Sequence, residues 1–181
     1  MTTAYNDAAG RSVGAVTVAG NLGGQTLTPG RYKSTSSLEI SSGDLTLDAQ
    51  GDANAVFIFQ MASTLTTTSG RQVILGRGVQ AANVFWQVGS SAVLGTTSVF
   101  KGNILALTSI TLATGATLDG RALARNGAVA LDSNTITTPA PVPCGDVNGD
   151  GVVNIGDALV VAQFDCSCGN VASSPTPKRA T

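Results

Sequence analysis

The residues best suited to chemistry lie in one twelve-residue loop near the carboxyl end of the chain, residues 146–157. Oxygen ligands fall at the loop positions that a hard cation requires, and a glycine at the sixth position permits the sharp turn. Because calcium prefers carboxylate, amide and carbonyl oxygens, the loop predicts a calcium site. The predicted ligands are Asp146, Asn148, Asp150, the carbonyl oxygen of Val152, Asn154 and Asp157. The alternative is a turn rich in Asp, Asn and Gly that fits the pattern by chance.

An EF-hand-like arrangement would place this loop before a helix at about residues 156–164, whose apolar positions form one stripe. The three cysteines lie in the same region, since positions 1–143 contain none. Cys144 can bridge to Cys166 or Cys168 in an oxidising compartment, closing a loop of about 22 to 24 residues and stabilising the fold by about 3 kcal/mol. Three reduced thiols are the alternative.

The absence of histidine excludes several kinds of active site, including a Ser-His-Asp triad and a histidine metal site. Solenoid hydrolases use clustered carboxylates, but Glu39 is the only glutamate here. Four aspartates lie at turn-like positions without a paired motif: Asp44, Asp48, Asp119 and Asp132. We therefore do not expect an enzyme. A net charge of −1 lacks the basic surplus of a nucleic-acid binder, and no apolar run approaches the roughly 20 residues of a membrane span.

Short strands separated by Gly, Asn, Asp and Ser turns make up the chain from residue 11 to residue 138. Alternation of apolar and polar residues predicts four inward side chains: Leu38, Ile40, Leu45 and Leu47. Residues 55–59 and 83–87 are apolar on both faces, which predicts buried strands with a helix lying over them. Residues 1–10 have the spacing of the last turns of a helix, with a glycine suited to its carboxyl-terminal cap.

A near repeat occupies residues 89–137. With a constant shift of 24 residues along the chain, residues 92–95 fall on 116–119 and residues 101–107 fall on 125–131. A period of about 20 to 30 residues, built from short strands and turns, is typical of a stacked solenoid. The sequence therefore predicts a mainly β protein whose coils depend on their neighbours for a core.

Composition divides the chain after the repeat. Prolines at alternate positions in residues 139–143 predict a semi-rigid linker. Residues 144–168 form the acidic calcium repeat, and residues 169–181 have the composition of a disordered tail.

Several motifs occur together in an order that is similar to one known family. They are GNLGG (20–24), TPGRY (28–32), LTLDA (45–49), AVFIFQ (55–60), NVFWQVG (83–89) and GNILA (102–106). Residues 1–137 in this respect resemble the microbial ice-binding-protein family. The resemblance implies a discontinuous right-handed β-solenoid of triangular section with a long helix along one side. It also implies secretion, and either ice binding through a flat Thr-rich face or service as an adhesion or matrix module.

Outward threonines on stacked strands suit ice binding, because β-branching restricts χ1 and places a methyl group beside the hydroxyl. Alternation points five threonines outward: Thr46, Thr66, Thr111, Thr117 and Thr135. Four more are weaker candidates: Thr64, Thr68, Thr96 and Thr137. The sequence does not decide which side of the solenoid each occupies, and threonine is also an ordinary exposed strand residue.

The sequence departs from the family pattern at its start, because residues 1–10 resemble the end of the family's long helix. We therefore expect an amino-terminally truncated form of a secreted protein, with no signal peptide in this chain and an exposed apolar coil edge that makes it fold poorly. Residues 144–168 resemble one calcium repeat of a type I dockerin, a module that normally pairs two repeats. The expected partners are an ice surface and, weakly because only one repeat is present, a cell-surface or cohesin-like protein.

Overall fold

The computed structural model describes residues 2–18 and 20–139 of the chain. The predicted calcium ligands, the three cysteines, the helix at 156–164 and the tail lie outside the described residues. Among the described residues, no helix reaches the length and apolar character that crossing a membrane requires.

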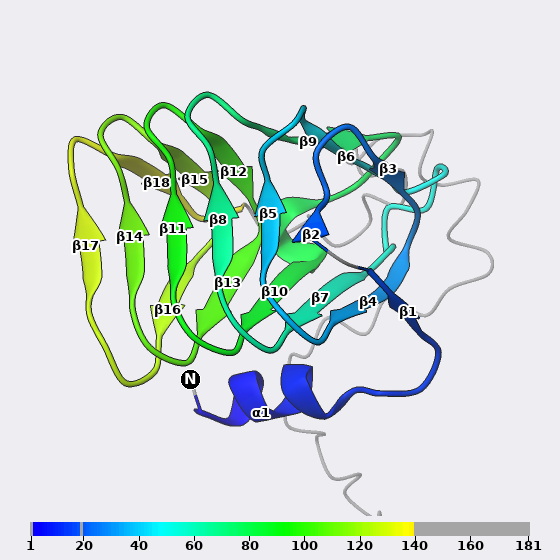
Figure 1. Ribbon diagram of the computed structural model, residues 1–181. Helices are drawn as coiled ribbons and strands as arrows, with labels where there is room; N and C mark the ends of the chain where they lie inside the picture. The colour runs from blue at the N-terminus through cyan, green and yellow to red at the C-terminus, as the bar shows by residue number, and fades with distance from the viewer. Residues whose placement is uncertain (1, 19, 140–181) are drawn as a thin grey trace, which may run out of the picture. The chain divides into compact units, whose positions relative to one another are not determined.

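One helix and many short strands follow one another along the chain (Figure 1). Their bounds are α1 (Thr2–Gly10), β1 (Ala15–Thr17), β2 (Gly20–Asn21), β3 (Thr26–Leu27), β4 (Gly30–Ser34), β5 (Leu38–Ile40), β6 (Leu45–Asp48), β7 (Phe57–Met61), β8 (Leu65–Thr67), β9 (Val73–Gly76), the 3-10 helix η1 (Ala81–Asn83), β10 (Val84–Val88), β11 (Ala92–Leu94), β12 (Val99–Lys101), β13 (Asn103–Ala106), β14 (Ile110–Leu112), β15 (Thr117–Asp119), β16 (Ala122–Ala124), β17 (Val129–Leu131) and β18 (Thr135–Thr137).

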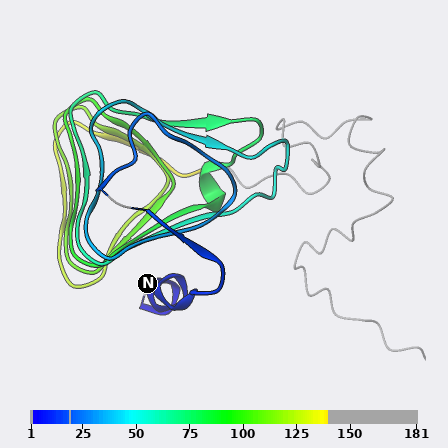
Figure 2. The same cartoon turned by 45° about the vertical axis from the view of Figure 1, so that its right-hand side comes forward.

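The strands form parallel sheets in which every third strand along the chain is a neighbour. Sheet A has the order β1-β4-β7-β10-β13-β16, and sheet B has the order β2-β5-β8-β11-β14-β17. The third side is divided between sheet C (β3-β6-β9) and sheet D (β12-β15-β18), joined by one bridge between Gln72 and Val99. Each coil thus contributes one strand to each side, and the stacked coils outline a triangle in Figure 2. The predicted mainly β solenoid-like fold is confirmed.

The spacing of the later coils differs from the one predicted. Ala92 pairs with Ile110 and Val99 pairs with Thr117, and the same spacing of 18 residues separates Lys101 from Asp119. The alignment of residues 92–95 with 116–119 is therefore wrong. A coil of 18 residues gives each of its three sides about six residues. The predicted shift of 24 residues therefore equals one coil plus one side. Residues 92–94 of sheet B and residues 116–118 of the third side share the same inward-outward-inward alternation, which is why this shift aligns them.

The coils in the middle of the chain are longer, and most of the extra residues lie at one corner. Leu38 pairs with Leu65, and Leu65 pairs with Ala92, so these coils have the spacing of 27 residues that also separates Ser37 from Thr64. The difference arises mainly between the third side and sheet A: β9 ends at Gly76 and β10 begins at Val84, whereas β12 and β13 are separated by Gly102 alone. The sheets themselves stay in register through both coil lengths.

An ion pair joins successive long coils at this corner. The Arg77 guanidinium donates to the Asp48 carboxylate through both Nε (2.7 Å) and Nη2. These hydrogen bonds hold the pKa of Asp48 below its ordinary value and raise the pKa of Arg77. Both groups are in contact with water, so the pair fixes the loop geometry more than it stabilises the fold.

The core lies inside the triangle and is built from alternate residues of all three sides. The four predicted inward leucine and isoleucine side chains of β5 and β6 are completely buried, which confirms the alternation argument. Aromatic rings stack across sheet A: Phe59 lies 4.0 Å from Trp86 and 5.2 Å from Tyr32, measured between ring centroids. Phe100 extends this stack from β12.

Helix α1 covers the outer face of sheet A, as the two apolar strands predicted. Its Tyr5 and Ala8 are buried against β7, β10 and β13. Two glutamines at paired positions fasten it: Gln60 Nε2 donates to the Ala8 carbonyl (2.6 Å), and Gln87 Nε2 donates to the Tyr5 hydroxyl (2.9 Å). The helix therefore lies on one side of the solenoid only, and sheet B has no covering element among the described residues.

The last described coil, β16 to β18, has an open edge. All three residues of β17 are exposed, and so is Ile136 of β18. Leu131 is 56% exposed although its register partner Leu112 is buried. The expected apolar coil edge is thus present among the described residues, while the expectation that the chain folds poorly stays a prediction.

Candidate functional site

Sheet B presents an array of short side chains along the middle of its strands. In register, successive strands place outward Asn21, Glu39, Thr66, Val93, Thr111 and Ala130. On β8, β11 and β14 the residues on either side of this position are buried, so each strand offers its central residue to water. The middle of sheet B therefore carries methyl and hydroxyl groups with no charge.

The residues just before and just after these strands continue the same chemistry. Those before are Ser37, Thr64, Ser91, Ser109 and Ala128, and those after are Ser41, Thr68, Gly95, Ala113 and Asp132. Within this set of rows, charged groups occur only at the two margins: Glu39, which accepts a hydrogen bond from Ser41 (2.8 Å), and Asp132. Between these margins lies an uncharged surface, which we call the sheet-B face. It consists of Thr64, Thr66, Thr68, Ser91, Val93, Gly95, Ser109, Thr111 and Ala113.

The sheet-B face is held rigidly. The ladder fixes neighbouring strands about 4.8 Å apart, and outward residues along one strand recur at about 6.6 Å. Hydroxyl groups on neighbouring coils also bond to one another, Ser37 with Thr64 (2.8 Å) and Ser91 with Thr108 (2.7 Å). Because β-branched threonine has few χ1 choices, its methyl and hydroxyl groups hold fixed positions. Such an array can order a layer of water at constant spacing.

The structure divides the predicted ice-binding threonines between two sides. Four of them belong to the sheet-B face: Thr64, Thr66, Thr68 and Thr111. Four others lie on the third side, in sheets C and D: Thr46, Thr117, Thr135 and Thr137. Thr96 lies in the turn after β11. The threonines of the sheet-B face and those of the third side therefore cannot contact one flat surface together.

The third side is a poorer candidate for a flat contact. It is broken between sheets C and D, and ion pairs cross its strands, namely Lys101 with Asp119 (3.3 Å) and Arg71 with Asp44 (3.6 Å). Ile74 also stands 44% exposed beside Thr46. This side therefore combines charge, bulk and an interruption that the sheet-B face lacks.

Sequence reasoning missed the members of the sheet-B face that are not threonine. Val93 lies between Thr66 and Thr111 in the same row, and the serines before the strands complete a second row. The coil spacing would have revealed this row, because Val93 follows Thr66 by one long coil and Thr111 follows Val93 by one short coil. The incorrect alignment of the repeat concealed it.

No acid cluster suited to a metal occurs in residues 2–18 and 20–139. The predicted calcium ligands and the cysteines Cys144, Cys166 and Cys168 are not among these residues.

Comparison with known proteins decides the family. The model of one family, described as ice-binding-like, matches residues 1–137. The chain belongs to this ice-binding-like family. It is 54% identical to the ice-binding protein of Nostoc sp. (strain HG1) over 136 residues, which are 75% of this chain and 50% of the relative. It is 44% identical to the ice-binding protein of Flavobacterium frigoris (strain PS1) over 145 residues, 77% of this chain and 50% of the relative.

Solved structures of the family share the fold. A crystal structure of an ice-binding protein from an Antarctic biological consortium matches with a TM-score of 0.75 and 63% identity, covering 77% of this chain and 63% of that one. The ice-binding protein of Antarctomyces psychrotrophicus matches with a TM-score of 0.74 and 42% identity, covering 77% and 68%. The predicted family is confirmed. The chain spans about half the length of the curated relatives it matches.

Proposed function

We propose that the chain binds ice through the sheet-B face. The observation that carries this proposal is the uncharged row of Thr66, Val93 and Thr111, held in register on three neighbouring strands with no covering element among the described residues. Family membership supports ice as the ligand, since the matched relatives are ice-binding proteins by name. Binding of this kind involves no covalent step, so the protein acts as a shaped surface.

Rigidity is what makes such a surface effective. The hydroxyl groups hydrogen-bond to water while the methyl groups and Val93 limit where that water can sit, so a bound layer takes its spacing from the sheet. The side chains lose little freedom on binding, because packing and β-branching already restrict them. The margins at Glu39 and Asp132 bound the array, since ionised carboxylates hold water in their own hydration shells.

Thr66→Tyr tests this assignment. A ring projecting from the centre of the sheet-B face would hold a flat ice surface away from its neighbours. We expect ice recrystallisation inhibition to require at least about tenfold more protein, equivalent to losing about 1.4 kcal/mol of binding free energy. Ice recrystallisation is followed by microscopy of a frozen protein dilution series.

The matched control is Thr117→Tyr, which adds the same ring to a strand in sheet D. It should leave inhibition within about twofold of the unsubstituted chain. Equal losses in both variants would refute the choice of face. A folded chain that shows no inhibition at all would favour the alternative function, a secreted or cell-surface adhesion or matrix module in which the dockerin-like repeat serves attachment.

We further propose that the protein is secreted and that residues 146–157 bind one calcium ion. The support is the family resemblance for secretion and the spacing of oxygen ligands in the sequence for calcium. Titration calorimetry with calcium chloride should show one site, and Asp150→Ala should weaken it at least about tenfold, because a ligand and a negative charge are lost. Asp165→Ala removes an acid outside the loop and should change the affinity by less than about twofold. Equal weakening in the two variants would mean diffuse attraction rather than a site.

A further inference from the structure

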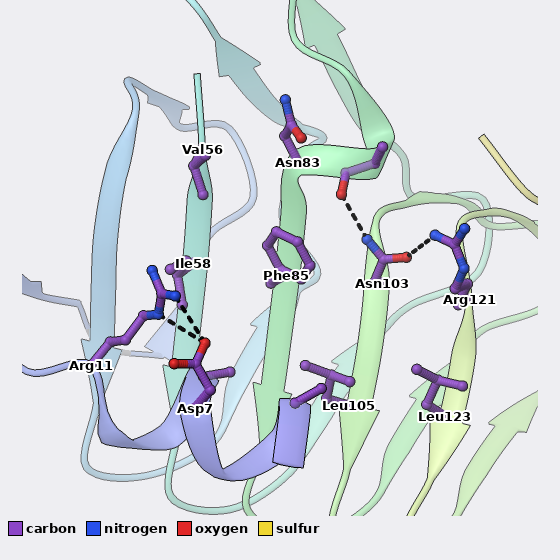
Figure 3. Close-up of a pocket in the computed structure, with 13 residues that line it drawn as sticks. Asp7, Arg11, Val56, Ile58, Asn83, Phe85, Asn103, Leu105, Arg121 and Leu123 are labelled. Atoms are coloured by element: carbon purple, nitrogen blue, oxygen red, sulfur yellow. Dashed lines mark hydrogen bonds and ion pairs between the residues drawn. The ribbon is translucent and has the colours of Figure 1, made fainter. Parts of the chain in front are cut away.

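A groove of about 540 Å³ lies on sheet A beside helix α1, on the side of the solenoid away from the proposed ice surface. Figure 3 shows it between the helix and the loops that lead into β10 and β13. Its size falls within the range of about 300 to 1,000 Å³ that is typical of small-molecule sites. The proposed ice contact leaves this groove unexplained.

The floor of the groove is apolar. Ile58, Phe85, Leu105 and Leu123 occupy neighbouring strands of sheet A, and Figure 3 shows them along the groove. Ile58 and Leu105 are almost fully buried, whereas Phe85 and Leu123 remain partly exposed to the groove. An apolar ligand body lying on this floor would remove both of the latter side chains from water.

One rim of the groove holds a positioned cation. The Asn103 side chain is buried, and its Nδ2 donates to the carbonyl oxygens of Ala82 (3.0 Å) and Val84 (3.2 Å). These bonds fix the amide so that its Oδ1 accepts a hydrogen bond from Arg121 Nη1 (3.0 Å). A buried asparagine thus aims an arginine at the groove.

Arg121 differs from several other cations around the solenoid. Arg71, Arg77 and Lys101 each pair with an aspartate of a neighbouring coil, and Arg11 on the opposite rim pairs with Asp7 (2.9 Å). Within residues 2–18 and 20–139, no carboxylate lies within ion-pair distance of Arg121. Its guanidinium therefore offers donors to a ligand beside an apolar floor. A planar fork of this kind binds a carboxylate through two parallel hydrogen bonds.

We propose that this groove binds a small amphiphilic carboxylate, with its apolar body on Phe85 and Leu123 and its carboxylate on Arg121. Charge complementarity determines the head group, because Arg121 places a positive charge at the rim without a carboxylate from the described residues to neutralise it. The floor determines the body, because it is built from apolar side chains. The site is independent of ice binding, since the two lie on different sheets.

Titration calorimetry of the full chain with dodecanoate, below its micelle concentration, tests the proposal. Saturable binding of one dodecanoate is expected, and Arg121→Gln should weaken it at least about tenfold through loss of a charge-assisted pair. Dodecanol, which keeps the chain but lacks the charge, should bind at least about tenfold more weakly than dodecanoate for the same reason.

Arg125→Gln is the matched control. It makes the same change of charge on the same side of the solenoid, but Arg125 lies over the Tyr5 ring (5.6 Å to its centroid) and does not line the groove. It should alter the affinity by less than about twofold. Equal weakening by the two glutamine variants, or no saturable binding, overturns the proposal. If Arg121→Gln lowers the melting temperature, Arg121→Lys keeps the charge without the fork and should still weaken dodecanoate binding, and an unchanged affinity would also overturn it.

Discussion

Replacing Trp86 by alanine is expected to lower the free energy of unfolding by about 3 to 5 kcal/mol, the usual range for deleting a buried large aromatic side chain. Trp86 is completely buried at the centre of the aromatic stack, between Phe59 and Phe100. Its removal would leave a cavity between three coils. It would also deprive the Lys101 carbonyl oxygen of the hydrogen bond that Trp86 Nε1 donates (3.0 Å).

A loss of this size is a large part of the roughly 5 to 15 kcal/mol that stabilises an ordinary domain. Urea unfolding followed by far-ultraviolet circular dichroism measures it, because Trp86 is the only tryptophan and its fluorescence is lost in the variant. Val93→Ala shortens an exposed side chain of sheet B and should change stability by no more than about 0.5 kcal/mol. Similar midpoints for the two variants would show that the stack does not organise the core.

Gly120→Ala is expected to destabilise the chain by at least about 2 kcal/mol, through backbone strain and overlap together. Gly120 has a φ of +154°, and an added Cβ would overlap the Gly102 carbonyl oxygen of the neighbouring coil. The two glycines stack where the third side turns into sheet A, so the clash is with backbone that cannot rotate away. Thermal unfolding measures the cost.

Gly10→Ala provides the comparison, since a Cβ there meets nothing within 4 Å. It should change stability by less than about 0.5 kcal/mol. If Gly120→Ala unfolds at the same temperature as Gly10→Ala, the close stacking of these coils does not constrain the corner.

The sequence predicted the local features of the fold because they depend on local pattern. Alternation identified the inward Leu38 and Leu47, and the apolar character of residues 83–87 predicted a covering helix. The coil length could not be read in the same way, since the strands of sheet B and those of the third side share one alternating pattern. Only pairings such as that of Ala92 with Ile110 separate the true coil length from a shift to the next side.

The candidate sites depend on the pairing between coils even more strongly. Alternation shows that Thr66 and Thr117 both point outward, but not that they lie on different sides of the triangle. The groove is still harder to predict from the sequence, because Asn103 and Arg121 come together only through the pairing of β13 with β16 on successive short coils. Asn103, a polar residue in an otherwise apolar strand, was the signal that the sequence offered. The sequence did not show that its partner is Arg121.

The corner that absorbs the difference between long and short coils has a practical consequence. Because β9 and β10 are separated by a loop while β12 and β13 are separated by one residue, the chain already accommodates two lengths at this position. Sheet B keeps the same register across both. We therefore expect a segment grafted into the loop between Gly76 and Val84 to leave the register of sheet B unchanged, which makes this corner a natural attachment point for a label, a tether or a second binding module.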